Sequence, residues 1–110
     1  MAAGQRDILL VLTTLPDRAT ATALAQLLVE QRLAACVNIL AECTSVYRCE
    51  GEVKNTIEVP LLIKTSCLTY EALEQKIRAH HPYELPEILR IPASGLPAYL
   101  AWVNRESAAG

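Results

Sequence analysis

The residues best suited to chemistry gather in one short stretch, HHPYELPEI at residues 80–88, where two imidazoles are followed by a phenol. Imidazole nitrogens bind copper and zinc, and imidazole, phenol and carboxylate groups also serve as general acids and bases. Pro82 and Pro86 restrict the backbone of the residues before them, which is typical of a rigid connection. The stretch is therefore a metal site, an acid/base site or a stiff turn.

Metal binding by this stretch requires ligands from elsewhere. His80 and His81 are adjacent, so they cannot share one face of a helix or strand, and at most one points at a given ion. We favour the alternative in which His80 flanks a helix C-terminus and His81 forms hydrogen bonds in an interface, because partial positive charge is favoured there. The candidate metal ligands are His81, His80 and Cys49; no cofactor is obligatory, and copper or zinc is the candidate ion.

A second candidate set consists of Glu58, Lys64, His81 and Tyr83, whose side chains could line a ligand-binding cleft. Glu58 and Lys64 share one side of an expected strand, but six residues of strand separate them by about 20 Å. Only a bulge at Pro60 or a neighbouring subunit could gather the set. An interface salt-bridge network is the alternative to catalysis, since such networks also shift pKa values.

The sequence contains none of the motifs that carry common catalytic chemistry. It has no nucleophile with an adjacent base, no glycine-rich phosphate loop and no HExxH. We therefore predict a non-enzymatic protein without catalytic residues.

The four cysteines have spacings of seven, six and eighteen residues, without a CxxC. Cys36 falls in an apolar run and Cys67 at a helix entrance, where a free cysteine behaves as a small buried hydrophobe. Cys43 and Cys49 are about 20 Å apart along one strand, so this pair cannot chelate one ion. Cys49, at a polar turn, is expected to be the exposed and reactive thiol.

Hydrophobic periodicity predicts the elements that must position these residues. Four strands are expected: one at 8–15, one that begins with 33–40 and precedes the Glu50-Gly51 turn, one at 53–64 and one at 87–91. Helices are expected from Asp17 to about Arg32, between Thr69 and Pro82, and around Leu96 to Val103. The order β-α-β-β-α-β plus a C-terminal helix is the split-βαβ pattern of an α+β, ferredoxin-like fold with antiparallel strands under two helices. We expect one domain over residues 1–110, with flexible tails at 1–6 and 106–110.

The Glu50-Gly51 turn should join two strands that are long for a domain of this size. Pro60 cannot donate to a sheet ladder, so the second strand is expected to be bulged or at an edge there. A long β-hairpin with a free edge invites pairing with a neighbouring chain. The sequence therefore predicts a closed homo-oligomer.

Charge and hydropathy exclude several classes of partner. The net charge is -2 and no two Lys or Arg residues are adjacent, which argues against nucleic acid. The apolar run at 8–12 is too short to cross a bilayer and is not followed by a small-residue cleavage site, so no membrane association is expected. We expect a cytoplasmic protein with reduced thiols.

Five stretches together resemble the CutA divalent-cation-tolerance family: LTTLPD at 12–17, RLAACVNI at 32–39, SVYRCEGEV at 45–53, EVPLLIKT at 58–65 and HPYELPEI at 81–88. The resemblance covers about residues 8–104. It implies a ferredoxin-like subunit that forms a homotrimer by pairing hairpin strands between neighbours, as the regulatory PII proteins also trimerise. It further implies a role in tolerance of copper and other divalent metals, with Glu58, Lys64, His81 and Tyr83 lining a cleft between subunits.

Two positions depart from the family pattern. Some relatives have a cysteine credited with copper binding where this chain has Thr13, and the hairpin motif usually has a tryptophan where this chain has Cys49. The resemblance thus implies weak binding of a metal ion or a small molecule between subunits. A PII-like trimer that binds a metabolite and signals to a partner is one alternative, and an acid/base enzyme in the same cleft is another.

Overall fold

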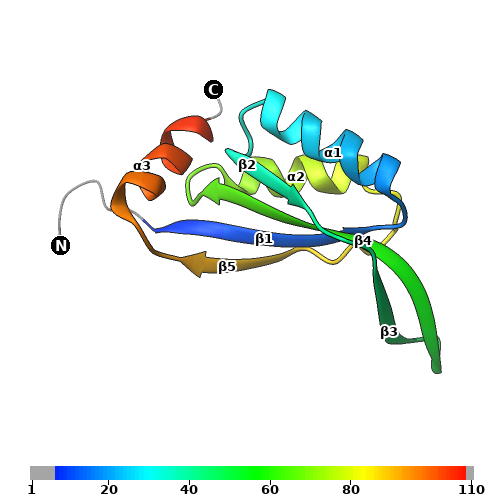
Figure 1. Cartoon of the computed structure of the whole chain (residues 1–110). Coiled ribbons are helices and arrows are strands. Elements are labelled where there is room, and N and C mark those ends of the chain that lie inside the picture. The colour runs from blue at the N-terminus through cyan, green and yellow to red at the C-terminus, as the bar shows by residue number, and fades with distance from the viewer. Residues whose placement is uncertain (1–6, 109–110) are drawn as a thin grey trace.

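The computed structural model describes residues 7–108. Along the chain these form β1 (Ile8–Leu15), α1 (Arg18–Glu30), β2 (Cys36–Ile39), β3 (Cys43–Cys49), β4 (Glu52–Ser66), α2 (Tyr70–His80), β5 (Leu89–Ala93) and α3 (Pro97–Glu106). Helices α1 and α2 lie on one face of the sheet, and α3 lies at its far end (Figure 1). The expected α+β class, with strands under two helices and a C-terminal helix, is confirmed.

The sheet has the order β2-β4-β1-β5, and every pairing is antiparallel. Strand β4 separates β1 from β2, so β1 and β2 run parallel and α1 crosses between them. This is the split βαβ arrangement that the element order predicts. Strand β3 pairs with the other half of β4, and these two strands form a hairpin that projects away from the sheet (Figure 1).

Pro60 explains why the segment opposite β4 forms two strands, β2 and β3. The carbonyl of Pro60 accepts a hydrogen bond from the Leu40 amide at 2.9 Å. In an antiparallel strand the N–H and C=O of one residue point the same way, so the missing N–H of Pro60 faces residues 40–42. There β2 has ended and β3 has not begun. The expectation of a bulge at Pro60 is confirmed: three residues, 40–42, separate Ile39 from Cys43, whereas only two residues of β4 separate Leu61 from Glu58. On its other side Pro60 pairs with Thr14 of β1.

The last strand also differs from its predicted range. It was expected to end before Pro92, but β5 continues to Ala93, with Pro92 opposite Leu9 of β1. An edge strand tolerates proline because only one of its sides must supply donors to the sheet. Strand β5 occupies that position in the described sheet.

The hydrophobic core lies between the sheet and helices α1 and α2. Alternate residues of β1 and β4 point toward the helices and are almost completely buried, and they meet Leu28 of α1 and Leu73 and Ile77 of α2. Burial of each such side chain contributes about 1.5–3 kcal/mol. Asp17 begins α1 as its N-cap, with Oδ1 accepting a hydrogen bond from the Thr20 amide at 2.7 Å. The core contacts and the N-cap together set the orientation of α1 relative to β1.

Leu100 and Val103 of α3 cover one end of the opposite face of the sheet, where they pack against Ile8 and Ala35. Beyond α3, Leu89 and Ile91 on β5 remain exposed. On the hairpin, Val46, Val53 and Ile57 are 65%, 61% and 58% exposed. Apolar surface of this kind, gathered on neighbouring strands, marks an interaction surface.

The C-terminal end of α3 is held in place. Arg32 donates from its guanidinium to the Arg105 carbonyl at 2.8 Å, and Ser107 is completely buried. The expected tail at 106–110 is therefore wrong for residues 106 and 107, because α3 extends to Glu106 and Ser107 packs against the end of β4. Residues 1–6, 109 and 110 lie outside the described residues. No helix in the described part of the chain is long and apolar enough to cross a membrane.

Candidate functional site

The segment after α2 returns to the foot of the hairpin, and His81 anchors it. His81 is buried, and its Nε2 lies 2.9 Å from the Thr14 carbonyl, which can only accept a hydrogen bond. Its Nδ1 lies 3.1 Å from the Tyr83 amide, which can only donate. These two partners specify the neutral imidazole with its proton on Nε2.

Burial lowers the pKa of His81, and the Thr14 carbonyl and the charge of Glu58 oppose this shift only in part. Protonation at Nδ1 would place a second donor against the Tyr83 amide. A metal ion would meet the same obstacle, because the Nδ1 lone pair already accepts that N–H. His81 can coordinate an ion only after this hydrogen bond breaks.

Tyr83 links the segment to β4. Its hydroxyl donates to Oε2 of Glu58 at 2.8 Å, and its ring lies 4.8 Å from the imidazole of His81, tilted by 52°. Burial, the hydrogen bond to Glu58 and the negative charge of that carboxylate raise the pKa of Tyr83 to about 12. The phenol therefore stays protonated near neutral pH and acts as a hydrogen-bond donor. Glu58 itself is only 9% exposed.

Glu58 and Tyr83 lie in an open groove of about 800 Å³ where the hairpin leaves the sheet. The hairpin side includes Val46, Tyr47 and Thr56, and the opposite side includes Leu85 and Glu87. Tyr47 and Thr56 share a hydrogen bond of 2.9 Å between their hydroxyls. We call this cavity the hairpin groove. Its lining combines two carboxylates, two phenols and several apolar side chains, and none of the described basic residues belongs to it.

The structure brings together three of the four residues predicted to line a cleft. Lys64 pairs with Leu10 of β1 and Cys36 of β2, near the other end of the sheet. Its Nζ lies 6.0 Å from the centre of the Tyr99 ring. Glu58 thus hydrogen-bonds to Tyr83 and not to Lys64, as the distance of about 20 Å along the strand requires.

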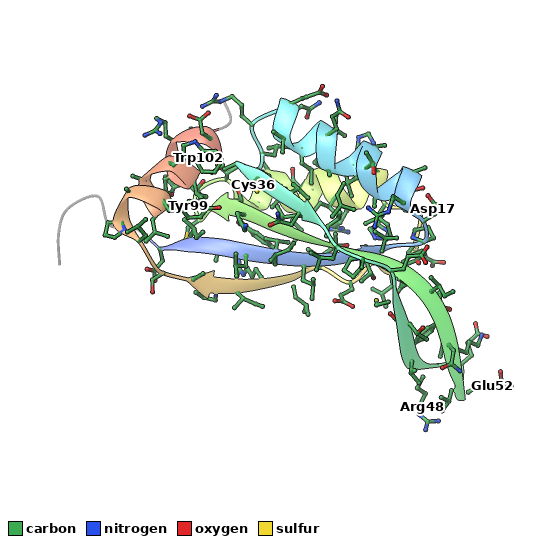
Figure 2. The ribbon with its side chains drawn as sticks, viewed as in Figure 1. Asp17, Cys36, Arg48, Glu52, Tyr99 and Trp102 are labelled. Atoms are coloured by element: carbon green, nitrogen blue, oxygen red, sulfur yellow. The ribbon has the colours of Figure 1, made fainter. Side chains whose placement is uncertain are left out.

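Aromatic side chains of α3 form the surroundings of Lys64. Tyr99 stacks on Trp102 with ring centroids 5.7 Å apart. Figure 2 shows both rings near the sheet end that carries Cys36, away from the hairpin. Lys64 is therefore separate from the hairpin groove within one chain.

The three predicted metal ligands lie far apart in the fold. His80 ends α2 and lines a groove against α1, His81 is buried at the hairpin foot, and Cys49 is exposed at the hairpin tip. Arg48 and Glu52, labelled in Figure 2, mark that tip. Within residues 7–108, no group of three or more His, Cys, Asp or Glu side chains could hold a metal ion.

The cysteines are all free thiols, and one differs from expectation. Cys67 was expected in the core but is exposed, because it lies in the turn between β4 and α2, where side chains no longer follow the faces of the sheet. Cys49 is exposed as predicted, while Cys36 and Cys43 are partly buried.

Sequence reasoning missed Tyr47, Thr56, Leu85 and Glu87 as groove residues. Period-two alternation along β4 places Thr56 on the same side as Glu58, so this signal could have identified Thr56. Tyr47 follows only from the register of the hairpin, in which it pairs with Lys54.

Comparison with known proteins identifies similar chains across nearly the whole length. The family described as CutA1 divalent ion tolerance protein matches residues 9–106. The divalent-cation tolerance protein CutA of Thermus thermophilus is 44% identical over 98 residues, covering 88% of this chain and 95% of that protein. Its solved structure superposes with a TM-score of 0.89 at 42% identity, covering 92% and 99% of the two chains.

Two further solved structures are similar to this chain. The PII-like protein CutA from Nostoc sp. PCC 7120 has a TM-score of 0.87 and 37% identity, covering 93% of this chain and 99% of that one. The periplasmic divalent cation tolerance protein CutA from Archaeoglobus fulgidus has a TM-score of 0.87 and 30% identity, covering 91% and 98%. The similarity therefore includes the projecting hairpin and the segment that forms the hairpin groove.

Proposed function

Because the chain belongs to the CutA1 divalent ion tolerance family, we propose that it contributes to divalent-cation tolerance, copper included, as a non-catalytic homotrimer that binds a ligand in the hairpin groove. The observation that carries this proposal is the hydrogen bond of 2.8 Å between Tyr83 and the largely buried Glu58, which places a held carboxylate inside an open groove.

The trimer is supported by surface that a single chain leaves uncovered. The molecule measures 49 × 26 × 23 Å because the hairpin projects from the sheet. The hairpin carries exposed Val46, Val53 and Ile57, and the outer edges of β2 and β3 have no partner strand among the described residues. Edge pairing with neighbouring chains would satisfy these edges and bury the apolar side chains. A neighbouring chain would also border the groove, which opens at the hairpin foot.

Ligand binding is favoured over catalysis by the state of the titratable groups. Both nitrogens of His81 are engaged, and the pKa of Tyr83, about 12, is far from the neutral range that suits a general acid or base. A volume of about 800 Å³ suits a small organic molecule. The groove is therefore better arranged to hold a molecule than to transform it.

Direct binding of a metal ion in the groove is a more specific form of the proposal. Copper or zinc bound by Glu58 would need further ligands from a neighbouring subunit or a displaced His81. The PII-like description of the Nostoc relative supports a second candidate, in which the trimer binds a metabolite and signals to a partner protein. We further propose a cytoplasmic location, in which the four free thiols stay reduced.

The test is growth in copper-containing medium of a strain lacking this protein, complemented with wild type, Glu58→Gln or Glu52→Gln. Glu52 lies on the same strand outside the groove and serves as the matched control. We expect wild type and Glu52→Gln to restore growth and Glu58→Gln to fail, with all three trimeric by sedimentation. Restoration by Glu58→Gln, or a monomeric wild type, would contradict the proposal.

A further inference from the structure

We propose that the ligand of the hairpin groove is an organic cation, namely a protonated amine on an apolar body. This inference rests on the proposed function of the groove as a ligand site and adds its chemical class. It follows from the charge of the groove, from the hydrogen bonding of Glu58 and from the rings and apolar side chains beside them.

The charged side chains that line the hairpin groove are acidic. Glu58 and Glu87 both contribute to it, whereas no lysine, arginine or histidine among residues 7–108 does so. The negative charge of Asp17 also reaches the groove, since it contributes to the raised pKa of Tyr83. A phosphate or carboxylate ligand would have to be buried beside Glu58 without a countercharge, which is strongly unfavourable.

The basic side chains near the groove do not neutralise its negative charge. Lys54 lies opposite Tyr47 in the hairpin, two residue pairs nearer the tip than Thr56, and does not line the groove. Arg18 begins α1 close to Asp17, but its guanidinium donates to the Leu40 carbonyl at 3.0 Å. A cationic ligand would therefore supply the positive charge that the groove itself lacks.

Glu58 retains an unused acceptor. Its Oε2 accepts from Tyr83, while no described residue donates a hydrogen bond to Oε1. A carboxylate that is nine-tenths buried is stabilised by a charge-assisted hydrogen bond, and an ammonium group carries up to three donors for it. The rings of Tyr47 and Tyr83 add faces that attract cations.

The rest of the lining suits the body of an organic molecule. Pro16 and Leu85 contribute apolar surface beside the charged groups. A bare divalent ion would leave this surface unused and would find only two carboxylates, where Ca²⁺ needs six or more oxygen ligands. Among cations, the groove thus favours an amine with a hydrocarbon part over a metal ion.

The experiment compares three probes of one shape on the purified full-length oligomer: phenethylamine, phenylacetate and phenethyl alcohol. Binding is followed by backbone amide shifts in nuclear magnetic resonance titrations, with zinc ion as a fourth probe. We expect phenethylamine to shift the amides around Thr56, Glu58 and Tyr83 and to bind at least about tenfold more tightly than phenylacetate. Glu58→Gln should remove that preference, whereas Glu52→Gln should retain it.

Each other outcome overturns a defined part of the proposal. Tighter binding of phenylacetate would reject the cationic class while leaving the groove a ligand site. Tighter binding of zinc than of the amine at the same amides would assign the groove to a metal ion. No shift with any probe would reject the ligand class and the proposed ligand site together. Unchanged phenethyl alcohol binding by Glu58→Gln shows that the variant retains its fold.

Discussion

His81 donates from Nε2 to the carbonyl of Thr14 across 67 residues of sequence, at 2.9 Å. This hydrogen bond ties the segment after α2 to the end of β1. Because Thr14 and Tyr83 both line the hairpin groove, His81 positions one of its walls without lining it. Two consequences follow, one for the pH dependence of stability and one for the hydrogen bond between Tyr83 and Glu58.

The first prediction concerns pH. Burial lowers the pKa of His81 below its ordinary value of 6.5, so the unfolded chain binds a proton more readily than the folded one. Stability from this group is present above the unfolded pKa and is lost as the pH falls from about 6.5 toward the folded pKa. We expect the Tm of wild type to fall over this window more steeply than that of His81→Gln, measured by scanning calorimetry.

His80→Gln provides the control, since His80 is the exposed neighbour at the end of α2. It should retain the wild-type slope. Equal slopes in wild type and His81→Gln would contradict the assignment of His81 as a neutral side chain that forms two hydrogen bonds.

The second prediction concerns Tyr83→Phe. Removal of the hydroxyl leaves Oε2 of the largely buried Glu58 without its donor, and we expect a loss of about 1–3 kcal/mol in the free energy of unfolding. Tyr47→Phe removes a hydroxyl from an exposed hydrogen bond and should cost less than about 0.5 kcal/mol. Urea unfolding measures both. A smaller loss for Tyr83→Phe than for Tyr47→Phe would contradict the assigned role of Tyr83.

The third prediction uses two buried threonines. Thr13 is completely buried and its hydroxyl has no hydrogen-bond partner in the described part of the chain, whereas Thr65 is equally buried and donates to the Leu33 carbonyl at 2.7 Å. We expect Thr13→Val to raise the free energy of unfolding by about 1 kcal/mol and Thr65→Val to lower it by a similar amount. Denaturant midpoints of the two variants should move in opposite directions, and movement in the same direction would reject this explanation.

The position of Thr13 also bears on metal binding. Its side chain lies on the same face of β1 as Val11 and Leu15, toward the core beneath the helices. Thr14 is the neighbour that points into the hairpin groove. A soft ligand at position 13 would therefore lie under the helices, on the opposite side of the sheet from Glu58.

The order of the elements could be predicted because it depends on local patterns. Alternation along β4, helical spacing at Leu24 and Leu28, and the cap at Asp17 are each encoded within a few residues. The separation of β2 from β3 was missed because it depends on which neighbouring strand the missing N–H of Pro60 faces. That direction is set by pairing with Thr14, which is distant in sequence.

The candidate site was predictable only in part for the same reason. The stretch at 80–88 identified His81 and Tyr83, and alternation identified Glu58. The prediction grouped Lys64 with them only through a bulge or a neighbouring subunit, and within one chain Lys64 lies near the other end of the sheet, opposite Leu10 and Cys36. Tyr47 can be assigned to the groove only when the register of the hairpin is known, and Glu87 only when the path of the chain after α2 is known.

The last prediction tests the apolar side of the hairpin. Ile57 is 58% exposed and lies in β4 opposite Thr44, on the face that also carries Val46 and Val53. If a neighbouring chain covers this face, Ile57→Lys would bury an unpaired charge in the interface and weaken the oligomer by several kcal/mol. Leu68→Lys, at an 84% exposed turn residue, is the matched control. We expect sedimentation velocity at micromolar concentration to show the trimer for wild type and Leu68→Lys and smaller species for Ile57→Lys. An unchanged sedimentation coefficient for Ile57→Lys would mean that subunits do not associate through this side of the hairpin, and the uncovered edges of β2 and β5 would then be the surfaces to test.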